Sequence, residues 1–155
     1  MSDFKIIEVK SKNNLNDFVR FPFSLYSKNP FWVPTIIKED IDHFNFLKEG
    51  FGDKISITFF LAYQNRNIVG RIAAIINWTE VNKLKKRKIR FGWFDTVDNI
   101  EVTKLLLEKI EETGRNNGLE FIEGPMGFST MDKAGMLIEG FDEKNTMITW
   151  YNAPY

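Results

Sequence analysis

The sequence predicts an α/β protein with a mixed sheet, and two segments carry this prediction. Residues 55–63 alternate between apolar and polar positions, and a second apolar arm, 68–78, follows the turn 64–67, which indicates an antiparallel hairpin. Residues 88–125 contain an apolar strand, an amphipathic helix and a second strand. A helical connection between two strands implies a parallel crossover, which is right-handed in nearly all proteins.

The first fifty residues are expected to form one strand and two helices. Residues 4–9 have the composition of a short strand, and Asn14 can cap a helix that extends over residues 15–26. In residues 29–34, two prolines and three apolar side chains predict an extended, buried connection. Helical periodicity returns over residues 36–50, with apolar side chains on one side and charged ones on the other.

The elements of the second half have clear sequence signals at their ends. Residues 68–76 are apolar on both faces, which is typical of a central strand. Asp98 is the expected cap of the next helix, with Glu101 completing a capping box, and Gly118 permits the positive φ angle at its end. Residues 119–123 are expected to be the last strand of the crossover.

Residues 1–155 are interpreted as one domain, because a chain of 155 residues suffices for a single core and contains no internal repeat. After residue 125 the regular pattern fades, although residues 136–138 and 147–150 could be short strands. Aromatic residues make up 15% of the chain, which argues against disorder. A secretory signal pattern and a long apolar window are both missing from the sequence, so a cytoplasmic location is expected.

The composition excludes several classes of site. Lys and Arg number 21, as do Asp and Glu, so the chain lacks the overall field that non-specific nucleic-acid binding requires, and only local basic patches are left open. The absence of cysteine excludes disulfides, thiol nucleophiles and thiolate metal sites. The single histidine, His43, has no partner ligand three or four residues away, so we expect it to pack on its helix or face solvent rather than bind a metal.

Six basic residues follow the hairpin within a short stretch of sequence. They could contact phosphate or an anionic membrane surface, and the alternative is a solvated loop or strand edge. These residues are Lys83, Lys85, Lys86, Arg87, Lys88 and Arg90.

Motifs spread over nearly the whole chain resemble a known family. They occupy residues 21–26, 29–34, 69–77, 91–95, 124–129, 140–142 and 151–155. Together with the order of the elements, they resemble the GNAT-like N-acyltransferases, and within them a bacterial group that includes the bacterial ceramide synthases. Proteins of this group are longer, so residues 1–155 are expected to be the amino-terminal part of a longer chain.

The resemblance implies a fold and a reaction. The fold is a central, mostly antiparallel sheet with one parallel crossover and helices on both faces. In such proteins the parallel strands splay apart and the acyl-CoA fits into the gap, with its pyrophosphate at the start of the following helix. The implied reaction moves an acyl group from acyl-CoA, or from an acyl-carrier protein, to an amine such as a sphingoid base, without a metal.

Direct attack of an amine on a thioester needs a base, a polarised carbonyl and a proton donor, which suits a chain with one histidine and no cysteine. The candidate catalytic residues are Asp95, Ser129, Asp132 and Tyr151. The candidate residues for binding donor or substrate are Asn77, Trp93, Phe94, Thr96 and Glu123. Residues 95–99 are the first place to look for the site, because ligands of α/β proteins gather at strand carboxyl ends and helix amino ends.

The candidate catalytic residues also have structural alternatives. Asp95 and Asp98 could cap the helix, Ser129 and Asp132 could belong to a turn, and Tyr151 could simply be packed. The corner 95–99 has two carboxylates and no glycine, a combination that would repel a phosphate.

The alternative function is therefore a non-catalytic GNAT-like module for binding or assembly. If the protein is an enzyme, its donor could instead be held by a carrier protein or by the basic run. The apolar residues 147–155 predict association with a carboxyl-terminal half or with a second copy. An open apolar slot between the two parallel strands would favour the enzyme over the binding module.

Overall fold

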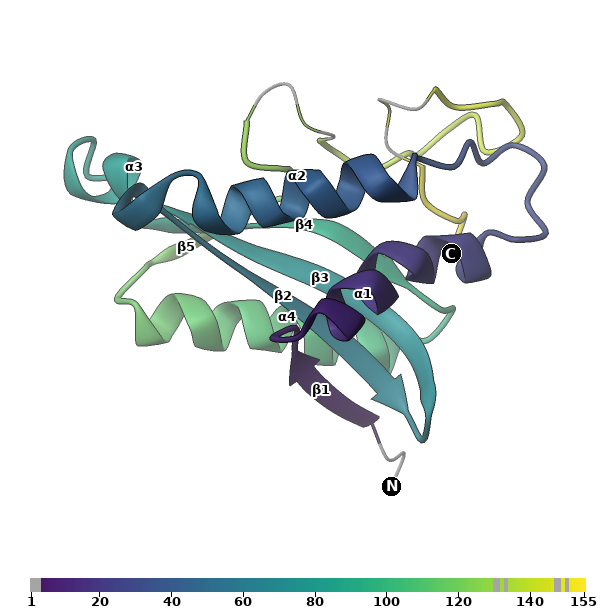
Figure 1. Cartoon of the computed structure of the whole chain (residues 1–155), viewed down its shortest axis with the longest axis horizontal. Helices are drawn as coiled ribbons and strands as arrows, with labels where there is room; N and C mark the ends of the chain where they lie inside the picture. The colour runs from purple at the N-terminus through teal and green to yellow at the C-terminus, as the bar shows by residue number, and fades with distance from the viewer. Residues whose placement is uncertain (1–3, 130–131, 133, 147–148, 150) are drawn as a thin grey trace.

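One mixed sheet forms the centre of the protein, as the computed structural model describes it for residues 4–129, 132, 134–146, 149 and 151–155. Its strand order is β1-β2-β3-β4-β5, with antiparallel pairs from β1 to β4 and a parallel pair between β4 and β5 (Figure 1). The strands are β1 (Phe4–Glu8), β2 (Ile55–Gln64), β3 (Asn67–Asn77), β4 (Lys88–Thr96) and β5 (Phe121–Glu123). The predicted mixed sheet with one parallel crossover is thus confirmed.

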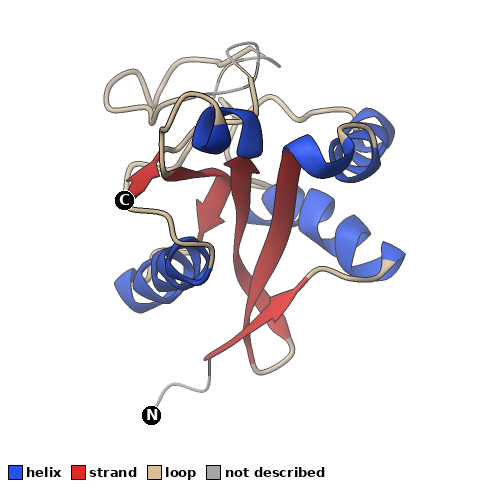
Figure 2. Ribbon diagram, turned by 90° about the vertical axis from the view of Figure 1, so that its left-hand side faces the viewer, coloured by secondary structure: helices blue, strands red, loops and turns tan. Residues whose placement is uncertain are grey.

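Helices cover both faces of this sheet (Figure 2). The helices α1 (Lys12–Leu25) and α2 (Ile37–Glu49) pack on one face, and α4 (Ile100–Asn116) packs on the other. A 3-10 turn, η1 (Gly52–Lys54), and the short helix α3 (Trp78–Asn82) lie together at one end of the sheet. The arrangement gives the protein two apolar layers around one sheet.

Each apolar layer is built from side chains that are almost completely buried. Leu106 and Ile110 of α4 pack on the face that carries Ile72 of β3. On the opposite face, Phe18 of α1 and Phe44 of α2 meet aromatic and aliphatic side chains of β2 and β3. Because β3 is covered from both sides, its sequence has to be apolar at successive positions, as the sequence predicted.

Several predicted boundaries are wrong by a few residues. Ser11 rather than Asn14 caps α1, because its hydroxyl accepts the Asn14 amide at 3.1 Å. Asn99 rather than Asp98 caps α4 by accepting the Glu101 amide at 2.9 Å. In both cases a neighbouring polar side chain that can cap equally well occupies the position where the extended backbone turns into the helix.

Two further differences concern the strands and a short helix. α3 was not predicted, since its five residues carry too little periodicity to be recognised. β5 is shorter than expected, and residues 136–138 form no strand. Within the last predicted strand, 147–150, only Thr149 belongs to the described residues, and it is not in a strand.

The parallel strands β4 and β5 stay together over three residue pairs only. Lys88 to Arg90 pair with β5, and the parallel ladder ends at Glu123, although residues 124–126 stay in contact with β4. The amide of Met126 donates to the Phe91 carbonyl at 2.8 Å, and a side chain at Gly92 would collide with the Met126 carbonyl oxygen. Beyond this contact the end of β4 has no neighbouring strand on that side among the described residues, which leaves room for a pocket.

The apolar layer under α4 gives a test of the fold. Leu106→Ala should lower the free energy of unfolding by about 2–5 kcal/mol, because the side chain is fully buried and its removal leaves a cavity. Leu84→Ala is the matched control, since Leu84 is 60% exposed and should change stability by less than about 0.5 kcal/mol. Urea denaturation of both variants measures the difference, and equal values would contradict the packing described above.

Candidate active site

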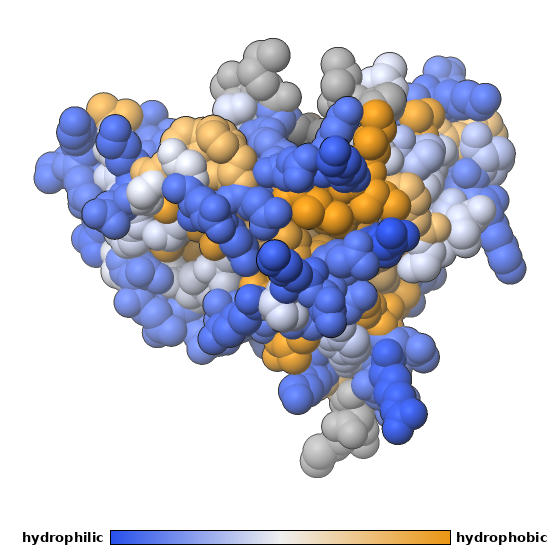
Figure 3. Space-filling model, in the orientation of Figure 1, coloured by the Kyte–Doolittle hydropathy of each residue, from blue (hydrophilic) through white to orange (hydrophobic). Residues whose placement is uncertain are grey.

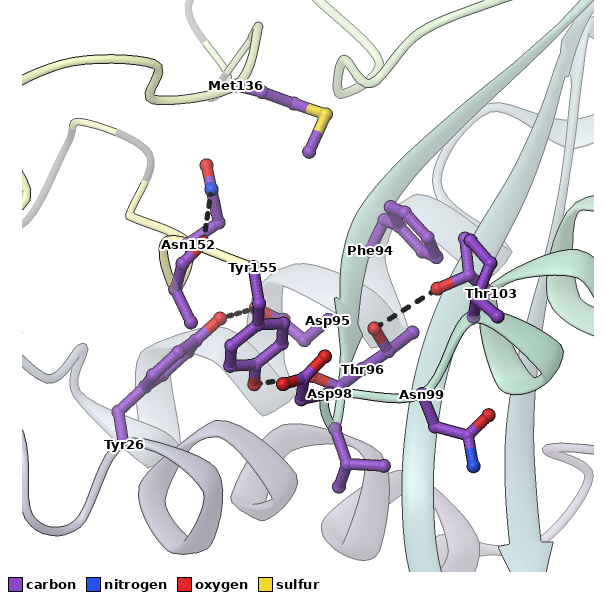
Figure 4. Close-up of a pocket in the computed structure, with 13 residues that line it drawn as sticks. Tyr26, Phe94, Asp95, Thr96, Asp98, Asn99, Thr103, Met136, Asn152 and Tyr155 are labelled. Atoms are coloured by element: carbon purple, nitrogen blue, oxygen red, sulfur yellow. Dashed lines mark hydrogen bonds between the residues drawn. The ribbon is translucent and has the colours of Figure 1, made fainter.

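A pocket of about 210 Å³ lies where β4 ends and α4 begins. Tyr26 from the end of α1 and the segment 152–155 form its other walls (Figure 4). The labelled residues that line it are Tyr26, Phe94, Asp95, Thr96, Asp98, Asn99, Thr103, Met136, Asn152 and Tyr155. The pocket therefore occupies the corner that the sequence singled out.

A buried ion pair lies at the inner wall of this pocket, where Asp95 lines the pocket and its partner Arg71 does not. The Arg71 Nε atom of β3 donates to Asp95 Oδ2 at 2.7 Å, and the Tyr26 hydroxyl donates to Asp95 Oδ1, also at 2.7 Å. All three residues are less than 10% exposed. The Arg71 Nη1 atom also donates to the Phe18 carbonyl at 2.8 Å, so the network joins β3 and β4 to the middle of α1 and to Tyr26 at its end.

The register of the sheet explains why these groups meet. Arg71 and Asp95 are direct partners on β3 and β4, next to an irregularity at which β4 shifts register. Trp93, within that irregularity, has a positive φ angle of 46°. A bulge of this kind re-aims the side chains that follow it, and here Asp95 faces the Arg71 guanidinium.

Burial strongly affects the tyrosine of this network. It raises the pKa of Tyr26 well above the usual value of tyrosine, and the charge of Asp95 and the hydrogen bond to it raise the pKa further. Tyr26 thus stays protonated and keeps donating to Asp95.

The ion pair changes the expected electrostatics of the corner. The sequence suggested two carboxylates that would repel a phosphate, but Asp95 is compensated by Arg71 and lies inside the protein. Asp98 remains as the exposed carboxylate of this turn. Because α4 also begins here, the positive end of its dipole faces the pocket. Residues 95–99 therefore repel an anion less strongly than the sequence implied.

Aromatic side chains surround the outer part of the site. The Tyr26 and Tyr151 rings meet edge to face at 5.4 Å, and Asn29 donates a hydrogen bond to the Tyr151 hydroxyl. The Tyr155 hydroxyl donates to the Thr96 carbonyl at 2.9 Å. Tyr151 is therefore buried behind Tyr26, whereas Tyr155 lies over the end of β4.

The structure places the other predicted catalytic residues elsewhere. The Ser129 amide donates to Asp132 Oδ2 at 2.7 Å, as expected for a turn. The other Asp132 oxygen is 3.6 Å from His43 Nε2, and the His43 ring lies beside Trp93. His43 thus packs on α2 and its neighbours as expected, and neither Ser129 nor Asp132 lines the pocket.

The predicted binding residues are divided between both ends of the sheet. Phe94 and Thr96 line the pocket, whereas Trp93 belongs to the apolar layer under α2. Asn77 caps α3 by accepting the Thr79 amide at 3.0 Å.

Glu123, at the end of β5, accepts hydrogen bonds from Lys88 and Arg90, and these bonds lower the pKa of its carboxyl group. The roles assigned to all of these residues stay predictions.

The basic run lies far from the pocket along β4. Lys88 is the first residue of this strand and Thr96 is the last, so roughly 26 Å of extended chain separates them. Lysines of the run therefore cannot contact a phosphate that is seated at the start of α4.

Tyr26, Arg71, Thr103 and Tyr155 contribute to the site but were not singled out from the sequence. Arg71 did leave a signal, because it is the one charged residue in the strand 68–76 and a buried charge requires a partner. Tyr26 and Tyr155 left none, because their proximity depends on chain folding over long sequence distances.

Two curated proteins are similar in sequence, while no family model matches the chain. Protein YghO of Escherichia coli is 33% identical over 132 residues, covering 85% of this chain and 34% of YghO. Bacterial ceramide synthase of Caulobacter vibrioides is 27% identical over 155 residues, covering 99% of this chain and 40% of the synthase. The chain thus spans between a third and two fifths of these relatives.

Solved acetyltransferases share the fold. One from Clostridium acetobutylicum, solved with acetyl-CoA, has a TM-score of 0.52 and 16% identity, covering 79% of each chain. A GNAT acetyltransferase from Staphylococcus aureus has a TM-score of 0.50 and 21% identity, covering 77% of this chain and 71% of its own. The predicted GNAT-like fold and the resemblance to the ceramide synthase group are confirmed. Among the described residues, no helix has the length and apolarity needed to cross a membrane.

Removing the carboxylate of the buried network should be costly. Asp95→Asn leaves the Arg71 charge buried without compensation, so we expect the free energy of unfolding to fall by about 3–5 kcal/mol. Asp98→Asn is the matched control, because Asp98 is exposed and its loss should cost less than about 0.5 kcal/mol. Similar urea midpoints for the two variants would show that the ion pair does not form.

The raised pKa of Tyr26 predicts a loss of stability at alkaline pH. Above the usual tyrosine pKa of 10.0, the unfolded chain releases this proton while the folded chain retains it. The stability that Tyr26 contributes is therefore complete below pH 10 and declines above it, by up to about 1.4 kcal/mol per pH unit. Tyr26→Phe should flatten this decline in unfolding experiments between pH 8 and 11, and parallel curves for the two proteins would contradict the prediction.

Proposed function

We propose, on the premise that the chain is a GNAT-like protein of the group that includes bacterial ceramide synthase, that it forms part of an N-acyltransferase. The observation that carries the proposal is the position of the pocket. It lies at the carboxyl end of β4 and the amino end of α4, beyond the point at which β4 and β5 separate. Ligand sites of α/β proteins favour this location, where strand ends and helix amino ends meet.

The proposed donor is an acyl thioester, with acyl-CoA as the first candidate. A solved acetyltransferase of the same fold contains acetyl-CoA, which supports a CoA-type donor. The pocket volume of about 210 Å³ is smaller than typical sites for whole ligands, which measure about 300–1,000 Å³. It fits one polar part of the donor, such as a phosphate at the start of α4, and the acyl chain would extend beyond it. A carrier-protein donor would present the same thioester.

The proposed chemistry is direct transfer. The amine nitrogen attacks the thioester carbonyl, a C–N bond forms and the C–S bond breaks, while a base takes the ammonium proton and the leaving thiolate receives a proton. Of the four predicted catalytic residues, Asp95 lines the pocket. Both of its oxygens accept hydrogen bonds from Arg71 and Tyr26, so we propose that it sets the charge and shape of the donor site.

The acceptor is proposed to be an amine of a lipid, such as a sphingoid base. The support is the 27% identity with bacterial ceramide synthase over almost the whole chain. Since this chain covers 40% of that protein, we propose that residues 1–155 correspond to an amino-terminal part and that further residues contribute to the acceptor site.

A second candidate function is a GNAT-like module that binds a partner without catalysis. One observation favours it: residues 124–126 lie against Phe91 and Gly92 of β4, which narrows the gap between the parallel strands. The exposed Asp98 at the pocket adds to this, because it opposes a phosphate.

Calorimetric titration with CoA and palmitoyl-CoA tests the proposed donor site. We expect saturable binding that Thr103→Glu weakens at least about tenfold, because this substitution places a negative charge in the pocket at the start of α4. Thr79→Glu is the matched control, because Thr79 is exposed in α3 and does not line the pocket. The affinity of this variant for CoA and palmitoyl-CoA should equal that of the wild type. Absence of binding by the wild type would favour the second candidate, and equal loss in both variants would contradict the location of the site.

A further inference from the structure

Residues 83–86 form a short exposed turn between α3 and β4, which we call the tip. Backbone hydrogen bonds define its conformation. The amides of Leu84 and Lys86 both donate to the Glu80 carbonyl, at 3.2 and 3.0 Å, and the Lys88 amide donates to the Lys86 carbonyl at 2.9 Å. Lys85 adopts a positive φ angle of 56°, which turns the chain at the apex. The tip is thus an ordered turn rather than an irregular loop.

Ion pairs divide the six basic residues of this region into two groups. Arg87 pairs with Glu120, and Lys88 and Arg90 each pair with both Glu80 and Glu123. In contrast, the three lysines of the tip form no ion pair with any residue that the structure describes. These lysines are Lys83, Lys85 and Lys86, and all three are exposed. The six basic residues and the carboxylates of Glu80, Glu120 and Glu123 sum to a local charge of +3, which is concentrated on the tip.

An apolar side chain stands in the middle of these free charges. Leu84 is 60% exposed and has a lysine on each side in the sequence. Figure 3 shows a small hydrophobic group surrounded by hydrophilic side chains at the end of the molecule where α3 lies. Because the backbone of the tip is fixed by its hydrogen bonds, Leu84 is held in solvent instead of folding back onto the protein.

We propose that residues 83–86 form a docking site for an anionic lipid surface. Lysines bind anionic headgroups as flexible point charges, while an apolar residue between them can enter the boundary between headgroups and acyl chains. The two arginines, which would suit nucleic-acid or phosphopeptide recognition best, are in ion pairs instead. An exposed leucine among the lysines favours a lipid surface, whose acyl boundary it can enter, over the phosphate backbone of a nucleic acid, which offers it no apolar partner.

This proposal does not depend on the proposed function. The tip lies at the amino end of β4 and the pocket lies at its carboxyl end, roughly 26 Å away. Lipid binding through the tip and donor binding in the pocket can therefore fail or succeed separately.

Vesicle flotation with the whole chain tests the docking site. We expect binding to phosphatidylcholine vesicles that contain phosphatidylglycerol, little binding to pure phosphatidylcholine, and weaker binding at high salt. The triple variant Lys83→Gln, Lys85→Gln, Lys86→Gln should weaken binding about a hundredfold, at about fivefold for each lysine. Leu84→Asp should weaken it at least about tenfold by removing the apolar anchor and adding a negative charge.

Matched control variants show whether vesicle binding depends on the tip itself or only on the net charge and exposed apolar area of the protein. Lys12→Gln, Lys28→Gln, Lys38→Gln makes the same change of net charge at exposed positions elsewhere, and Ile138→Asp replaces another exposed apolar residue. Both should bind vesicles as the wild type does, and circular dichroism checks that all variants are folded. The proposal is overturned if the tip variants and these controls lose binding equally, if neutral vesicles bind as well as anionic ones, or if polyglutamate or duplex DNA binds at the tip while vesicles do not.

Discussion

The buried ion pair between Arg71 and Asp95 is the interaction on which the site depends. It crosses from β3 to β4 in the interior, where an uncompensated charge would be strongly destabilising. Its remaining hydrogen bonds go to Tyr26 and the Phe18 carbonyl, so α1 is fixed to the same point. The end of β4 and the end of α1 are thereby held together, and the pocket lies between them and the start of α4.

The same ion pair decides the electrostatic character of the pocket. With Asp95 compensated, the main fixed charges at the corner are Asp98 and the positive end of the α4 dipole. The proposed donor site therefore does not require the glycine-rich turn expected for a phosphate.

β4 connects two surfaces with different chemistry. Its amino end carries the exposed lysines and Leu84, whereas its carboxyl end carries the buried network and the pocket. The two surfaces share a strand but no side chain, so a lipid surface and a thioester donor would not compete for the same residues. A protein that acylates a lipid amine would benefit from both, since its acceptor resides in a membrane.

The sequence by itself determined the elements whose signals are local. The alternation of residues 55–63, the apolar strand 68–76 and the helix 100–116 could be recognised because side-chain periodicity follows directly from backbone geometry. The motifs also identified the fold, which the solved acetyltransferases confirm. The corner 95–99 followed from the order of strand and helix alone.

Only the tertiary structure decided which charges are paired. Arg71 and Asp95 are 24 residues apart, and their contact depends on a strand register that includes a bulge. Likewise, Lys83, Lys85 and Lys86 look the same in the sequence as Lys88, but Glu80 and Glu123 reach only the latter. The physical reason is that the energy of a charge depends on its burial and on partners that are distant in the chain, whereas periodicity depends on neighbours.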